Sequence, residues 1–87
     1  MNMEFITTSL QCEYIAEIIC ARLGMTFVDI RDTMLAFEAD NISHRVIIYS
    51  EQDYLFAKKK IDCRIAVSKD VNNKYTVNVT DITISGR

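Results

Sequence analysis

This 87-residue sequence contains no proline, no tryptophan, only two glycines and a single histidine. A glycine-rich loop that cradles phosphate groups needs more than two isolated glycines, so the sequence excludes that type of nucleotide site. No uninterrupted apolar run exceeds four residues, far short of the roughly 20 that a membrane-spanning helix needs. The N-terminus also lacks the basic and apolar regions of a secretory signal, and we therefore expect a cytoplasmic protein.

The residue types that usually carry catalysis are also few. The three cysteines form no Cys-x-x-Cys pair, and their odd number predicts buried, reduced thiols rather than disulfides. His44 has only Asp40 close by in the sequence as a partner for general-base chemistry. The acidic residues at positions 29–40 match no known calcium or magnesium loop. We therefore predict no enzyme activity, no catalytic residue, no bound metal and no cofactor.

The composition is that of one small globular domain. Apolar residues make up 49% of the sequence and charged residues 25%, which is ordinary for a folded protein and argues against disorder. A chain of this size buries roughly 64% of its extended surface on folding, enough for one modest core. We therefore expect a single domain over residues 1–87.

The first part of the sequence predicts a strand followed by a long helix. Residues 3–7 have strand character, and the hydroxyl of Thr8 or Ser9 is placed to cap a helix that ends near Leu23. Gly24 stands where a left-handed C-terminal cap is wanted. One apolar face of this helix should contact the sheet, and it consists of Cys12, Ile15, Ala16, Ile19 and Leu23. The opposite face consists of Glu13, Tyr14, Glu17 and Ala21.

Alternating apolar and polar residues predict further strands. Residues 34–39 and 44–49 fit strands, whereas residues 26–31 fit either a strand or an extended connection. The last strand begins at Tyr75, and its apolar residues change parity part-way along. Because strand side chains alternate between two faces, this change requires a β-bulge near residues 80–81 or a break in the strand.

The middle of the chain decides between two α+β folds. Ser50 can cap a helix whose first turn is acidic and whose last turn carries the lysines at 58–60, in accord with the helix dipole. With a strand at 61–67, the order β-α-β-β-α-β-β resembles the ferredoxin-like sandwich, an antiparallel sheet with one or two helices on one face. The alternative makes residues 51–53 a turn and residues 54–60 a strand. It leaves one N-terminal helix on an antiparallel meander.

Charge is distributed unevenly along the sequence. Residues 1–53 hold nine acidic and three basic residues, a net charge of −6, whereas residues 54–87 have a net charge of +4. Surfaces of a single sign steer partners and set specificity, so this asymmetry favours recognition over catalysis. The alternative is that folding interleaves the two halves and cancels most of the asymmetry.

The favoured function is a small non-enzymatic protein that binds and regulates or inhibits a partner protein. Tyrosine is common at interface hot spots, and Tyr14 is flanked by acids on the first helix. An acidic surface of this kind could also occupy a nucleic-acid-binding partner in place of DNA or RNA. Small free-standing chains without an active site are common among inhibitors encoded by phages and other mobile elements. The predicted partner-binding residues are Glu13, Tyr14, Glu17, Asp29, Asp32, Glu38 and Asp40.

The alternative function is nucleic-acid binding by the basic C-terminal third, where aromatic residues interleave with lysines. The residues that would carry it are Tyr54, Phe56, Lys58, Lys59, Lys60, Arg64, Lys69 and Lys74. Against it, the pI of about 5.2 contrasts with the basic excess of most nucleic-acid-binding domains. A homodimer is a further expectation, since the two oppositely charged halves could pair between protomers.

Overall fold

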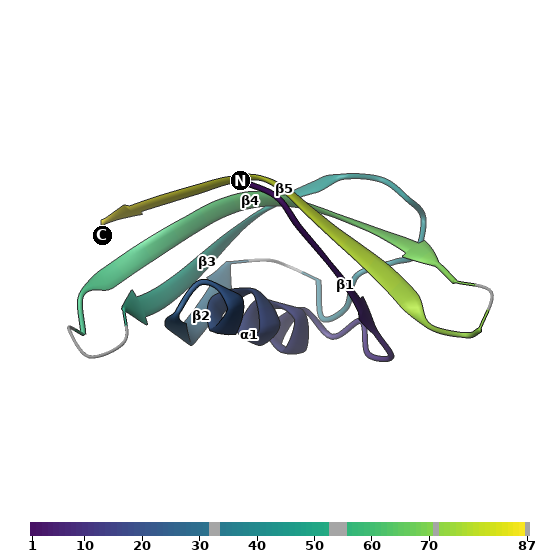
Figure 1. The fold of residues 1–87 in the computed structure, drawn as a ribbon, viewed down its shortest axis with the longest axis horizontal. Coiled ribbons are helices and arrows are strands. Elements are labelled where there is room, and N and C mark those ends of the chain that lie inside the picture. The colour runs from purple at the N-terminus through teal and green to yellow at the C-terminus, as the bar shows by residue number, and fades with distance from the viewer. Residues whose placement is uncertain (32–33, 53–55, 71, 87) are drawn as a thin grey trace.

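The computed structural model describes residues 1–31, 34–52, 56–70 and 72–86. These residues form one helix and a five-stranded antiparallel sheet with the strand order β1-β5-β4-β3-β2. The elements are β1 (Met3–Thr7), α1 (Cys12–Arg22), β2 (Met25–Arg31), β3 (His44–Gln52), β4 (Lys58–Lys69) and β5 (Tyr75–Gly86). The sheet arches over α1, which lies on its concave side (Figure 1).

The connections make this fold an antiparallel meander with one helix. Strands β2 to β5 follow one another, each paired with the next, and β1 joins the sheet beside β5. Helix α1 therefore carries the chain beneath the sheet from one edge to the other. The architecture of the alternative, one N-terminal helix on a meander, is confirmed, although β3 includes Glu51 and Gln52, which the alternative placed in a turn. The ferredoxin-like order with a second helix is wrong.

The helix predicted over residues 51–60 is absent wherever the structure describes that stretch, which excludes residues 53–55. Ser50 is buried in β3, and its hydroxyl donates to a methionine sulfur of β2 (3.3 Å) instead of capping a helix. Lys58 lies opposite Glu51 in the β3–β4 ladder. The prediction failed because the apolar residues in the middle of the stretch surround the helical wheel and leave no single face to bury.

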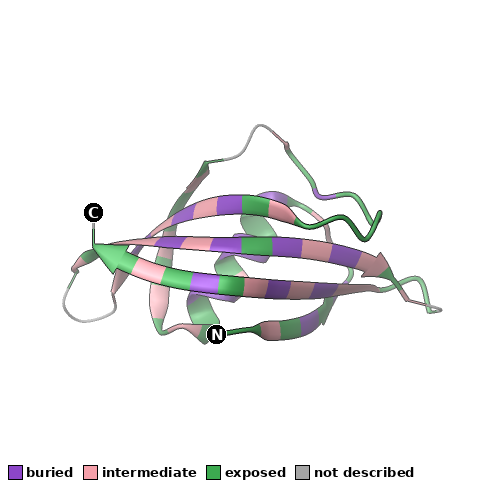
Figure 2. Cartoon of the chain, turned by 90° about the horizontal axis from the view of Figure 1, so that it is seen from above, coloured by how far each residue is buried: buried purple, intermediate pink, exposed green. Residues whose placement is uncertain are grey.

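The core lies between α1 and the concave face of the sheet, where buried and less buried residues alternate along the strands (Figure 2). The predicted apolar face of α1 is confirmed, although Leu23 is only partly buried and Cys20 is buried in addition. All three cysteines are buried and none forms a disulfide, as expected. The buried core residues are Phe5, Cys12, Ile15, Ala16, Ile19, Cys20, Phe37, Val46, Ile48, Ile61, Cys63, Ile65, Val67, Val77, Val79 and Ile82.

Two β-bulges interrupt the ladders. The pairing of β4 with β5 shifts between Asp62 and Arg64, and Asp81 has a positive φ of 54°. The bulge predicted near residues 80–81 is therefore confirmed, and it keeps Ile82 on the core side of the strand. The second bulge lies in β2, between Phe27 and Asp29. Because bulges bend a strand and increase its twist, they favour the arch of the sheet over the helix.

The two ends of α1 differ in how well the sequence predicted them. Gly24 has a φ of 71° and forms the expected left-handed turn. The helix begins at Cys12, however, and not after Thr8 or Ser9. The hydroxyl of Thr7 accepts a hydrogen bond from the Ser9 N–H (3.1 Å) and donates one to the Ser9 carbonyl (3.0 Å). These side-chain bonds stabilise a turn before the helix, which delays its start.

The predicted strand at residues 34–39 is also wrong, whereas the strand at 26–31 exists as β2. In place of the former strand there is an isolated bridge between Gln11 and Ala36. Its main-chain groups bond to the residues that enter α1 instead of to another strand. The alternation of apolar and polar residues could not distinguish a paired strand from an extended segment with a single bridge, because it does not identify the partner of the segment.

Candidate protein-binding site

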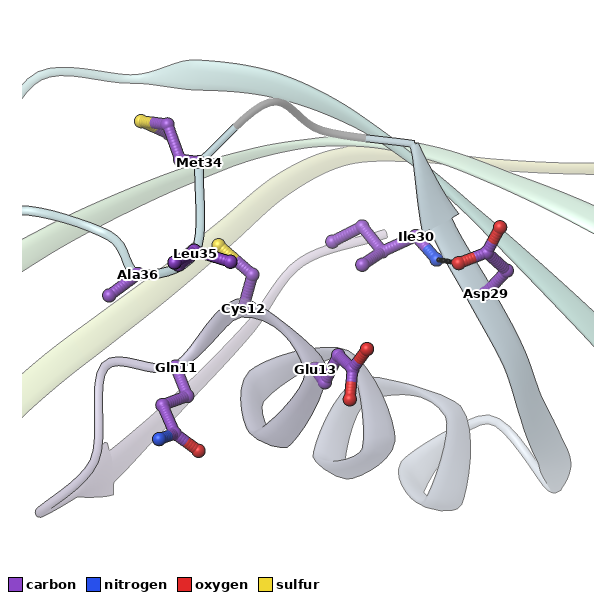
Figure 3. A pocket seen from close by; sticks show the side chains of 8 residues that line it. All are labelled: Gln11, Cys12, Glu13, Asp29, Ile30, Met34, Leu35 and Ala36. Carbon is purple, nitrogen blue, oxygen red and sulfur yellow. Dashed lines mark hydrogen bonds between the residues drawn. The ribbon is translucent and has the colours of Figure 1, made fainter.

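An open hollow of about 520 Å³ lies where the start of α1, the second half of β2 and the segment 34–36 meet (Figure 3). Its lining combines aliphatic, thiol, amide and carboxylate side chains. The lining residues are Gln11, Cys12, Glu13, Asp29, Ile30, Met34, Leu35 and Ala36.

The segment that forms one wall of the hollow is fixed by its main chain. The Cys12 N–H donates to the Leu35 carbonyl (2.9 Å), and the Phe37 N–H donates to the Leu10 carbonyl (2.8 Å). Phe37 is 3% exposed and anchors the segment in the core. The Leu35 side chain nevertheless remains 93% exposed. An apolar side chain is thus presented to solvent on a backbone that is held at its own carbonyl and at the N–H of Phe37.

Strand β2 forms the opposite wall. Ile30 extends from this strand across the hollow toward Cys12 and Leu35 (Figure 3). The Asp29 carboxylate accepts a hydrogen bond from the N–H of Ile30 (2.9 Å), which fixes the carboxylate at the rim. Glu13 supplies a second acid from the first turn of α1. The hollow therefore has an aliphatic lining and an acidic margin.

The structure brings together only part of the predicted partner-binding set. Glu13 and Asp29 line the hollow. Tyr14 follows Glu13 on the exposed side of α1, and its side chain is 44% exposed. Glu17 and Glu38 are exposed but do not line the hollow.

The last two members of that set lie elsewhere. Asp40 accepts a hydrogen bond from the Ile42 N–H (3.0 Å) and lies 4.0 Å from the His44 ring. Asp32 lies outside the described residues.

Sequence reasoning missed Leu35, which is the most exposed large apolar residue in the described part of the chain. The strand predicted at 34–39 implied burial of alternate residues, and Leu35 has no sequence signal of its own. A usable signal was the run Met34, Leu35, Ala36 and Phe37, which is too short for a helix and offers more apolar side chains than one face of a strand can bury.

Some basic residues of the sheet pair with acidic residues, although the β3–β4 register also places Arg45 opposite Arg64. Arg45 donates two hydrogen bonds to Asp62, one of them 3.0 Å long, and these bonds lower the pKa of the Asp62 carboxyl. Arg64 lies 4.0 Å from Asp81. Lys58 and Lys69 lie at the two ends of β4, which measures roughly 37 Å along the strand from one to the other, given the rise per residue. The Arg45–Asp62 pair joins the two charge halves, but it neutralises a base of the acidic half and an acid of the basic half and so does not reduce their charge asymmetry.

The remaining residues of the nucleic-acid alternative are scattered. Phe56 is 77% exposed with a positive φ of 52°, and Tyr54 lies outside the described residues. Lys74 follows the turn between β4 and β5, at the far end from Phe56. No aromatic residue lies on the outer face of β4 or β5, but Tyr49 of the neighbouring strand β3 lies opposite Lys60 and has the Arg31 guanidinium over its ring (5.7 Å).

Two further properties of the described residues concern metals and membranes. They contain no group of three or more His, Cys, Asp or Glu side chains that could hold a metal ion. Within the same residues, no helix combines the length and apolarity needed to cross a membrane.

Comparisons with protein-family models, with curated proteins and with solved structures found no match to this chain. The candidate site therefore stands on its geometry alone.

Proposed function

We propose that this chain is a small non-enzymatic protein that binds a partner protein through the hollow and thereby regulates or inhibits it. The observation that carries the proposal is the Leu35 side chain, 93% exposed on a fixed backbone beside an aliphatic hollow with an acidic margin. A single exposed leucine needs no explanation. A leucine held next to a recess lined by Ile30 and Met34 supplies both a projecting and a receiving element of an interface.

Rigid presentation supports binding because association is opposed by the entropy of ordering loops and side chains. The hydrogen bonds made by the Leu35 carbonyl and the Phe37 N–H hold the backbone before a partner arrives. An apolar centre with a polar margin is the usual anatomy of a protein interface. Glu13 and Asp29 at that margin favour a partner that carries lysine or arginine beside an apolar residue.

The class of partner follows from this charge preference. Basic surfaces are common on proteins that bind nucleic acid, and a chain with acidic groups around its interface would compete with DNA or RNA for such a surface. We therefore place inhibition of a nucleic-acid-binding protein first among the regulatory outcomes.

The test is capture of the partner from the native host, with and without nuclease, using single variants of the hollow. Leu35→Asp should abolish recovery of the partner, because it places a charge at the apolar centre. Ile6→Asp is the matched control, since Ile6 is also an exposed aliphatic residue (61%) but lies on β1. Asp29→Asn keeps the acceptor for the Ile30 N–H and should weaken binding by removing the charge alone.

The outcomes separate the two functions. A protein that survives nuclease and is lost with Leu35→Asp but retained with Ile6→Asp supports the proposal. Equal recovery by the two variants would contradict the assignment to the hollow. Recovery of nucleic acid alone would contradict protein binding and favour the basic residues of the C-terminal third.

A further inference from the structure

The strand edges of this sheet differ in how their main-chain groups are protected. An unpaired edge presents N–H and C=O groups that can pair with another chain, and natural proteins block such edges with bulges, charges or side-chain contacts. Open edges include the outer side of β1, the outer side of β2, and the part of β5 that β1 does not reach.

The edges of β1 and β2 are both protected. On β2, the bulge near Val28 breaks the regular ladder, and the Asp29 carboxylate occupies the N–H of Ile30 (2.9 Å). On β1, Arg22 donates from its guanidinium to the Glu4 carbonyl (3.2 Å) and lies over the Phe5 ring (5.3 Å). A charged side chain thus engages the main chain at each of these two strands.

The end of β5 lacks any such protection in the described part of the chain. Strand β1 pairs with β5 only as far as Val79, and the Met1 carbonyl then accepts from the Ile82 N–H (3.3 Å). Residues 83–86 continue in register with β4, but no described strand lies on their other side. Figure 2 shows this end of β5 extending past the N-terminus. The sequence there, Thr-Ile-Ser-Gly, carries no charge and no proline.

The direction of the main-chain groups follows from the bond at Ile82. Its N–H faces the β1 side of the strand, and these groups alternate along a strand. The N–H of Ile84 therefore faces the open edge, whereas Thr83 and Ser85 direct theirs toward β4. An added strand would meet Ile84 at the centre of this edge.

We propose that residues 83–85 in β5 of a second copy of this chain pair antiparallel with the same residues of this edge, about a two-fold axis at Ile84. The pairing ends there because Met1 already lies against Ile82, the position that Gly86 of the second copy would otherwise meet. A two-fold axis perpendicular to the sheet leaves the concave faces of both copies on the same side of the combined sheet. Each residue must therefore lie opposite a residue whose side chain points to the same face. Ile84 then lies opposite Ile84 of the second copy, and Thr83 lies opposite Ser85. The partly buried Ile84, at the margin of the core, gains an apolar cross-strand neighbour.

A second copy fits this edge because the edge carries no charge and has an apolar residue, Ile84, at its centre. The same uncharged residues meet on both sides, and a closed two-fold pair leaves no further edge for growth. The expectation drawn from sequence was pairing of oppositely charged halves. Edge pairing involves no charged residue, so raising the salt concentration should not dissociate the dimer.

Two double variants test the proposal: Thr83→Lys/Ser85→Lys and Thr83→Glu/Ser85→Glu. Both positions are exposed, so the fold should be retained. In either dimer, two pairs of like charges would lie directly opposite, and we expect a loss of about tenfold in dimer affinity. In an equimolar mixture the opposed pairs become attractive, and the heterodimer should form. Sedimentation over a dilution series, at low and high salt, provides the measurement.

The control is Thr76→Lys, on the stretch of β5 that β1 already covers, which should dimerise as the wild type does. A wild-type chain that stays monomeric at all concentrations would overturn the proposal. So would double variants that dimerise unchanged, or a mixture that fails to form the heterodimer. Leu35→Asp lies on a different surface and should dimerise normally, so this result is separate from the outcome for the partner-binding site.

Discussion

At the scale of single residues, Asp81 shows how one position can set the side on which a strand end is buried. Its φ of 54° lies in the left-handed region, where aspartate is tolerated better than most residues. The bulge adds one residue to β5, which returns the Ile82 side chain to the core side although the apolar residues of the sequence change from odd to even positions there. This part of the fold was predictable, because the parity change in the sequence allowed only a bulge or a break.

Substitution of Asp81 should therefore follow backbone preference rather than charge. We expect Asp81→Val to lower the free energy of unfolding by about 1–2 kcal/mol, because a β-branched residue is strained at a positive φ. Asp81→Gly and Asp81→Asn should stay within about 0.5 kcal/mol of the wild type. The ion pair with Arg64, at 4.0 Å and exposed, contributes little. Urea denaturation measures all three, and a neutral valine variant would refute the bulge.

Leu35 shows the opposite case, a residue whose role sequence could not supply. Its exposure depends on where the main chain of residues 35 and 37 forms hydrogen bonds, and the partners are Cys12 and Leu10 at the start of α1, far away in the sequence. Glu13 and Asp29 were predicted as partner-binding residues on charge alone, and both line the hollow. Acidic residues at a surface can thus be found from the sequence, whereas the run of four apolar residues at 34–37 indicates only that one of them is left outside the core and does not identify which.

At the scale of elements, the start of α1 and the segment 34–37 form a unit that neither part forms alone. The helix has no side-chain N-cap, and the first turn is completed by the Leu35 carbonyl. The sequence suggested a hydroxyl cap at Thr8 or Ser9 and a separate strand at 34–39. Both expectations failed for one reason: local propensity does not reveal a distant main-chain acceptor.

Two neighbouring substitutions should separate the anchor of this unit from its exposed part. Phe37→Ala should lower the free energy of unfolding by about 3–5 kcal/mol, because Phe37 is 3% exposed and its loss leaves a cavity. Leu35→Ala, two residues away, should change it by less than about 0.5 kcal/mol. Thermal and urea unfolding provide the comparison. Equal destabilisation by both would show that Leu35 is buried and would remove the basis of the proposed site.

At the scale of the whole molecule, the strand order was the part of the fold least accessible from sequence. The elements from β3 onward alternate clearly, but nothing local indicates that β1 pairs with β5 and lies at the opposite edge from β2. The charge layout has the same limitation. Glu51 from the acidic half meets Lys58 from the basic half only because the β3–β4 hairpin brings them together.

The contact between helix and sheet also buries thiols from both layers, Cys20 on α1 and Cys63 on β4. Burial, with a smaller effect of Glu17, raises the pKa of Cys20 to about 11. Burial, with smaller effects of Asp62 and Cys20, raises the pKa of Cys63 to about 12. In the unfolded chain both thiols titrate near 9.0, so above that pH only the unfolded state ionises and loses protons.

Stability from the two thiols is therefore complete below pH 9 and declines as the pH rises toward 11–12. Each thiol can remove up to about 1.4 kcal/mol per pH unit in that window. The matched control is the double variant Cys20→Ala/Cys63→Val, in which the other alkaline titrations remain. Its free energy of unfolding should fall less steeply between pH 9 and pH 11 than that of the wild type. Parallel slopes would show that both thiols ionise within the folded protein, and hence that water reaches the contact between α1 and the sheet.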